Sequence, residues 1–171
     1  MKRILIIAFL SISVAGFAQK HTALTGSIGL TLGNPELTDL QNNHVNANTV
    51  KQKQVLRFNL PIMNLDRINQ TGVGGIVKIE LGDKIALKEN FDLSKAALSD
   101  YFKWETTVSE GKITLTGTLI KTLPLGFDGT AVFELQTVKQ GISVITIQGI
   151  KAGANEKASD IPVYTFNVTA K

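Results

Sequence analysis

The sequence predicts an all-β protein: an antiparallel β-sandwich of the Ig-like or jelly-roll/cohesin-like kind, with at most one short helix. Three observations support this fold class. Apolar and polar residues alternate with a period of two in segment after segment, as they do in half-buried strands. Turn signals such as "GNPE", "SEGK" and "PLGFDG" separate these segments. Only one stretch has helix-forming character, and it is too short to form a layer.

The strands are justified one by one by their alternation. In chain order, the alternating or β-branched segments are 21–33, 53–60, 73–82, 112–121, 130–139, 142–150 and 161–170. In 53–60, Leu56, Phe58 and Leu60 share one face. Arg57 and Asn59 occupy the other face. Seven or more such strands, each with one apolar face, predict two sheets packed on a common core.

Two segments depart from this pattern. Residues 89–102 contain Asp92 or Ser94 as a possible N-cap, followed by two alanines and a leucine, which predicts one short helical turn. Residues 33–52 are the longest polar stretch and are expected to form a long loop, with room for a short edge strand.

The glycine-rich stretch "TGVGGIVKIELGD" at 71–83 raises the question of a phosphate-binding loop. Such a loop needs a helix N-terminus directly after the glycines, and a nucleotide P-loop also ends in Gly-Lys-Ser/Thr. Here the glycines lead into a strand pattern. They are expected to permit positive φ or close strand contact instead.

The N-terminus has the three-part layout of a secretory signal peptide, assigned to residues 1–18. Lys2 and Arg3 precede an apolar run over 4–14, and small residues lead to a cleavage site after Ala18. The run is shorter than the about 20 residues that a membrane span needs. An exported product is expected, in the periplasm, at the cell surface or outside the cell, that does not span the membrane after cleavage.

Cleavage removes 18 of the 171 residues and leaves 153, which suits a single domain over 19–171. The chain has no cysteine, so no disulfide framework is expected. Of 18 basic and 14 acidic residues, two basic ones lie in the signal peptide. The remaining basic residues are scattered singly along the sequence, without interleaved aromatics, so nucleic-acid binding is not expected.

The sequence contains no catalytic constellation, so no catalytic residue and no cofactor are assigned. The two histidines, His21 and His44, form no metal-ligand pair, and no Gly-x-Ser-x-Gly elbow is present. A small exported glycan hydrolase with a carboxylate pair remains the alternative, because such pairs assemble in space. Glu80 and Glu134 are the residues to test for it.

A calcium loop is a weaker hypothesis, and no other metal site is expected. Asp39, Asn42 and Asn43 place side-chain oxygens close together in the polar loop, with Asn46 nearby. Only one of them is charged, and the glycine-containing calcium motif is absent.

One aromatic cluster, "DYFKWET", suggests a binding surface formed by Tyr101, Lys103 and Trp104. If 101–108 is a strand, Trp104 shares a face with Phe102, which favours packing in the core. Tyr101 and Lys103 then share the opposite face.

Three stretches give a family resemblance: "TGVGGIVKIELGDKIALKENFDLS", then "EGKITLTGTL", then "GTAVFELQTVKQGISVITI". Their order over residues 50–150 resembles the cohesin-like, adhesin-type sandwich modules of exported bacterial proteins. The resemblance implies a binding or assembly module rather than an enzyme. The resemblance does not cover residues 20–50, and no binding residue of the family is assigned to a position of this sequence.

The expected function is therefore that of an exported, non-catalytic module. It would be an adhesin-like or matrix protein that binds a surface protein or polysaccharide, or that self-associates through its sheet edges.

Overall fold

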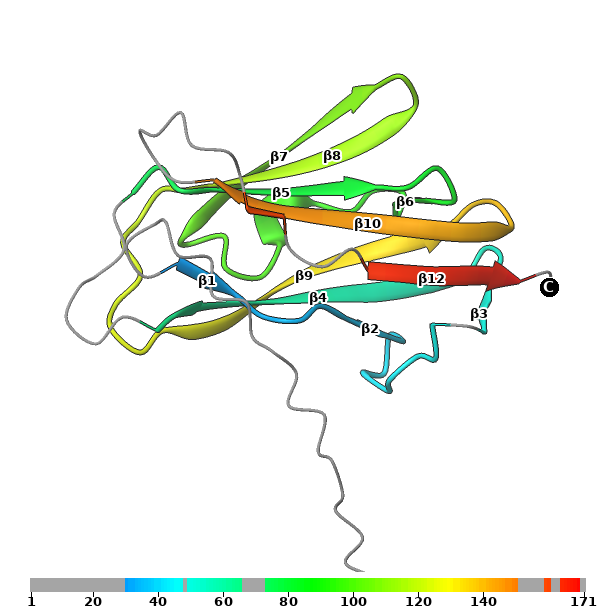
Figure 1. The fold of residues 1–171 in the computed structure, drawn as a ribbon, viewed down its shortest axis with the longest axis horizontal. Helices are drawn as coiled ribbons and strands as arrows, with labels where there is room; N and C mark the ends of the chain where they lie inside the picture. Colours follow the sequence, from blue (N-terminus) through cyan, green and yellow to red (C-terminus); the bar gives the residue numbers. More distant parts are fainter. Residues whose placement is uncertain (1–29, 48, 66–72, 151–158, 161–163, 170–171) are drawn as a thin grey trace, which may run out of the picture.

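A computed structural model describes residues 30–47, 49–65, 73–150, 159–160 and 164–169. Within these residues the chain forms two stacked β-sheets and one short 3-10 turn (Figure 1). The predicted signal peptide, most of the first predicted strand, and His21 lie outside them. No helix in the described part of the chain has the length and apolar character of a membrane span.

The first sheet has five strands in the order β1-β4-β9-β6, with β2 beside β4. Its strands are β1 (Leu30–Leu32), β2 (Glu36–Thr38), β4 (Val55–Asn64), β6 (Ile85–Leu87) and β9 (Asp128–Thr137). β1 and β2 pair with opposite halves of β4, and Pro61 lies opposite the break between them. A residue without a backbone N–H is tolerated there because neither β1 nor β2 pairs with Pro61, whose carbonyl accepts from the Gly33 N–H at 2.8 Å.

The second sheet has seven strands in the order β3-β12-β10-β5-β8-β7, with β11 beside β10. Its strands are β3 (Val50–Lys51), β5 (Ile76–Leu81), β7 (Phe102–Ser109), β8 (Lys112–Leu119), β10 (Gly141–Ile150), β11 (Ser159–Asp160) and β12 (Tyr164–Thr169). Every pairing is antiparallel except that of β3 with β12. The predicted antiparallel sandwich is confirmed.

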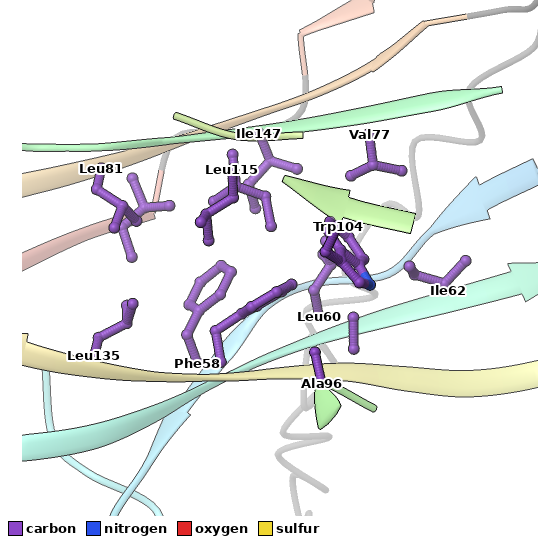
Figure 2. Close-up of a cluster of buried hydrophobic side chains, with 14 of the residues drawn as sticks. Phe58, Leu60, Ile62, Val77, Leu81, Ala96, Trp104, Leu115, Leu135 and Ile147 are labelled. Carbon is purple, nitrogen blue, oxygen red and sulfur yellow. The ribbon is translucent and has the colours of Figure 1, made fainter. Parts of the chain in front are cut away.

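The core lies between the sheets, where the apolar faces predicted from alternation meet. β4 alternates between half-buried and buried residues along its whole length. Phe58 and Phe133, paired across β4 and β9, are fully buried. Figure 2 shows Phe58, Leu60 and Leu135 of one sheet facing Leu81, Leu115 and Ile147 of the other. Each such side chain contributes roughly 1.5–3 kcal/mol relative to an exposed position.

The predicted short helical turn is present as a 3-10 turn, η1 (Leu93–Lys95). Asp92 is its N-cap and accepts hydrogen bonds from the Ser94 backbone N–H at 3.0 Å and its hydroxyl at 2.7 Å. This confirms Asp92 rather than Ser94 as the cap. The polar loop contains two very short strands, β2 and β3, instead of one.

The glycines before β5 have the predicted structural role. Gly74 has φ of 87° and its N–H donates to the Leu119 carbonyl at 2.7 Å. The Leu119 N–H returns a bond of 2.8 Å to Gly75. No helix follows, so the described part of this stretch has no phosphate-binding geometry.

The β8–β9 loop is tied to the first sheet by a buried amide. Asn64, at the end of β4, is fully buried. Its Nδ2 donates to the carbonyls of Leu123 at 3.1 Å and Pro124 at 3.0 Å. Its backbone N–H donates to the Phe127 carbonyl at 2.9 Å. These bonds hold one end of the sandwich together.

Candidate functional site

A groove of about 360 Å³ crosses the outer face of the five-stranded sheet. Its floor is formed by outward-facing residues of β4 and β9, namely Arg57, Asn59, Val132 and Glu134. Its walls come from the 39–46 loop and the segment around η1. The groove exists because the polar faces of β4 and β9 are flanked by two segments that rise above the sheet.

Hydrogen bonds and ion pairs fix the polar side chains of the floor. Arg57 Nη1 donates to Asn42 Oδ1 at 2.8 Å, and its Nε lies 3.9 Å from Glu134 Oε1. Lys88 Nζ lies 2.6 Å from the other carboxylate oxygen of Glu134. Asn59 Nδ2 donates to Thr38 Oγ1 at 3.0 Å. The floor is therefore organised before any ligand arrives.

An aromatic ring completes the groove. Phe91 lines it and packs edge-on against Phe133, with ring centroids 6.5 Å apart and planes at 63°. A half-buried ring beside amide and guanidinium groups offers an apolar platform and several hydrogen-bonding groups. This combination suits a hydroxyl-rich ligand such as a sugar.

Sequence reasoning missed this groove because its residues come from four separate segments. Only the outward position of Arg57, Asn59 and Glu134 was visible from alternation. No pattern in the sequence places Phe91 in the groove, because its position depends on how the loop before η1 folds over β9.

The predicted aromatic site is divided between the surface and the core. Trp104 is 7% exposed, and its ring stacks on Phe102 at 5.5 Å and meets Phe133 edge-on at 4.8 Å. Figure 2 shows it between the two sheets. The alternation that placed Trp104 with Phe102 is correct, and this burial removes it from the face that Lys103 occupies.

Tyr101 and Lys103 have local partners. The Tyr101 ring lies 4.8 Å from that of Phe127, and Lys121 Nζ lies 5.2 Å from its centroid. Lys103 is exposed, and its Nζ lies 2.7 Å from Glu105 Oε1. The hydrogen bond to Glu105, reinforced by its charge, raises the pKa of Lys103. Tyr101 is partly buried against the core, whereas Lys103 is exposed, and the binding surface predicted for them stays a prediction.

The loop proposed for calcium has other partners for its oxygens. Asp39 accepts hydrogen bonds from the Gln41 N–H at 2.9 Å, the Asn43 N–H at 2.8 Å and the Asn43 side chain at 2.8 Å. These bonds, led by the Asn43 side chain, lower the pKa of Asp39. Asn42 Oδ1 is held by the Arg57 guanidinium, a cation that opposes another cation.

Across the described residues, no group of three or more histidine, cysteine, aspartate or glutamate side chains is placed to hold a metal. The calcium hypothesis stays a prediction, and the contacts of Asp39 and Asn42 argue against it. His44 is exposed and forms an isolated bridge with Thr38.

No protein-family model matches the chain, and no curated protein matches it either. Similar solved structures do exist. The C-terminal domain of the antigen I/II polypeptide BspA of Streptococcus agalactiae has a TM-score of 0.53 at 11% identity, over 80% of this chain and 49% of that one. The C-terminal domain of the antigen I/II-family protein AspA of Streptococcus pyogenes has a TM-score of 0.51 at 14% identity, over 79% and 46%.

A cohesin module from a family 33 glycoside hydrolase of Clostridium perfringens is also similar, with a TM-score of 0.46 at 15% identity. It is matched over 96% of its length and 81% of this chain. The chain spans about half of each streptococcal structure. The two streptococcal similarities support the fold alone, a β-sandwich as predicted from the sequence.

Proposed function

We propose that this chain is an exported, non-catalytic module that binds a polysaccharide or a surface protein outside the cytoplasm. The export step rests on the signal-peptide pattern of residues 1–18. The binding role rests on the groove over β4 and β9, whose polar floor and aromatic wall suit a sugar chain. The sandwich fold is compatible with this role but does not by itself imply it.

The observation that carries the proposal is the pairing of the Glu134 carboxylate with two cationic side chains. Among the described residues that line the groove it is the one carboxylate, and both of its oxygens lie near cations. A glycosidase needs two carboxyl groups across the substrate, one of which donates a proton. Glu134 instead pairs with Arg57 and Lys88, which supports a binding role for the groove.

The test is retention of the chain on a panel of insoluble polysaccharides and on solubilised envelope, with and without a calcium chelator. The groove variant combines Phe91→Ala with Asn59→Ala. The matched control combines Thr114→Ala with Thr116→Ala, which lie on the outward face of β8 in the other sheet. Loss of retention in the first variant alone would support the groove, and equal retention by both would exclude it.

The hydrolase alternative predicts turnover that disappears in Glu134→Gln or Glu80→Gln. We expect no release of reducing ends from any retained polysaccharide. Turnover that is lost in either variant would replace the binding module by an enzyme.

Self-association through a sheet edge is a second candidate, favoured by β7. This eight-residue edge strand pairs with β8 alone in the seven-stranded sheet. Val108 lies on its core-facing side yet is 71% exposed, because the tip of the β7–β8 hairpin extends beyond the sandwich (Figure 1). Concentration-dependent sedimentation that is abolished by Val108→Lys would support pairing of two copies at this edge.

A further inference from the structure

Three turns converge at one end of the sandwich, on the right in Figure 1. They connect β3 to β4, β5 to β6, and β9 to β10. The first of them carries the chain from the seven-stranded sheet to the five-stranded one. This end is distinct from the groove described above.

Hydrogen bonds lock the three turns together, with Thr137 at their centre. Thr137 is 1% exposed, its hydroxyl donates to the Lys51 carbonyl at 2.6 Å, and it accepts from the Gln54 N–H at 2.9 Å. Its own carbonyl accepts from the Lys53 N–H at 2.9 Å. The Val138 N–H, in the third turn, donates to the Lys84 carbonyl, in the second turn, at 2.7 Å. This bond joins the second turn to the third.

This arrangement gathers lysines that are far apart in the sequence. Lys51 and Lys53 lie in the first turn, Lys84 in the second and Lys139 in the third. Asp83 is the acidic residue of these turns and is ion-paired with Lys84. The hydrogen bond from the Lys84 side chain, together with the charges of Lys84 and Lys139, lowers the pKa of Asp83. With four lysines and one aspartate, the three turns together carry a net positive charge.

A pocket of about 510 Å³ opens beside the first turn. Among its lining residues are His44, Asn46, Thr49, Lys51, Gln52 and Lys53, and none of the described residues that line it carries a carboxylate. Within the described residues, neither Lys51 nor Lys53 has an acidic side chain within 4.0 Å. Lys53 has φ of 62°, a left-handed conformation that is stabilised by the bond from its N–H to β9.

We infer that this pocket binds an acidic polysaccharide, with Lys51 and Lys53 holding its anionic group. Two ammonium groups supply the charge, and the amide and hydroxyl side chains around them suit a hydroxyl-rich chain. The volume lies in the range of small-ligand pockets. The inference rests on the proposed binding function and names a substrate class and a second surface for it.

The experiment measures binding of the chain from Gln19 onward to polygalacturonate, dextran sulfate and neutral dextran at low and high salt. The first two probes separate a carboxylate from a sulfate as the anionic group. We expect binding to at least one of them, none to dextran, and weakening with salt because the lysines are exposed.

The pocket variant combines Lys51→Gln with Lys53→Gln, and the control combines Lys78→Gln with Lys121→Gln. Both remove two positive charges, and the control lysines lie on β5 and after the far end of β8. We expect the pocket variant to weaken binding roughly 5- to 20-fold and the control to weaken it less than about twofold.

Equal losses in the two variants would overturn the inference, since attraction would then follow net charge alone. Equal affinity for a single-stranded oligonucleotide would overturn the choice of polysaccharide. Absence of binding to both polyanions would also overturn it. Retention on a neutral polysaccharide, unchanged in the pocket variant, would leave the groove and the proposed function intact.

Discussion

Gly117 is the position where one methyl group is expected to disturb the core most directly. A Cβ built there would lie 2.4, 2.6 and 2.7 Å from three ring carbons of Trp104. That ring cannot move aside easily, because Phe102 stacks on it and Phe133 meets it edge-on. Gly117→Ala therefore forces either the ring or strand β8 to shift.

The size of the effect follows from two opposing terms. Overpacking a closely packed core costs about 1–3 kcal/mol. Replacing glycine by alanine restricts the unfolded chain and returns about 0.4–1 kcal/mol where the backbone is compatible. We expect a net loss of about 1–2 kcal/mol, which lowers Tm by roughly 2–8 °C in a domain of this size.

The assay is urea unfolding followed by tryptophan fluorescence, which reports on this site because Trp104 is the only tryptophan. Gly75→Ala is the matched control, since its added Cβ would meet Leu30 Cδ2 at an ordinary 3.6 Å. In a Trp104→Phe background, where unfolding is followed by far-UV circular dichroism instead, the smaller ring should remove most of the cost. A Gly117→Ala protein with unchanged stability and an unchanged emission maximum would refute the packing argument.

Three further predictions concern single polar side chains. Asn64→Leu leaves buried carbonyls of the β8–β9 loop without their donor and should cost about 1–3 kcal/mol in urea unfolding; an unchanged midpoint would contradict the role of the amide. Thr137→Val should loosen the β3–β4 turn, which hydrogen exchange would detect as faster exchange at 50–55 with little change in the β5–β8 pair. The pKa of Asp39 is lowered in the folded state, so its stabilisation is present above the ordinary pKa of Asp, about 3.9, and is lost as pH falls through the folded value. Asp39→Asn should therefore flatten the acid side of the stability profile measured by urea unfolding, and an unchanged slope would count against it.

The strands were predictable because alternation is a local property. A period of two places every second side chain on one face, so Leu56, Phe58 and Leu60 had to be buried together. The same rule placed Trp104 beside Phe102. It also assigns Val108 to the core-facing side, but alternation gives only the face and does not determine how far the opposite sheet extends to cover it.

The candidate sites were not predictable from such local rules. The groove needs Arg57 of β4, Glu134 of β9 and Phe91 from the loop before η1. The calcium hypothesis for the polar loop stays a prediction. Asp39 and Asn42 have the composition of a cation site, and only the structure shows that they are bonded to N–H groups and to a guanidinium.

By itself the sequence determined that this chain forms two sheets of alternating strands, and it predicts an export signal. Those properties depend on neighbouring residues and on composition. Tertiary structure alone decided that Lys51, Lys53, Lys84 and Lys139 lie at one end. They are scattered singly in the sequence, and only the pairing of strands from two sheets brings their turns together. Electrostatic attraction depends on distance in space, so the charge of this end could not be read from the order of residues.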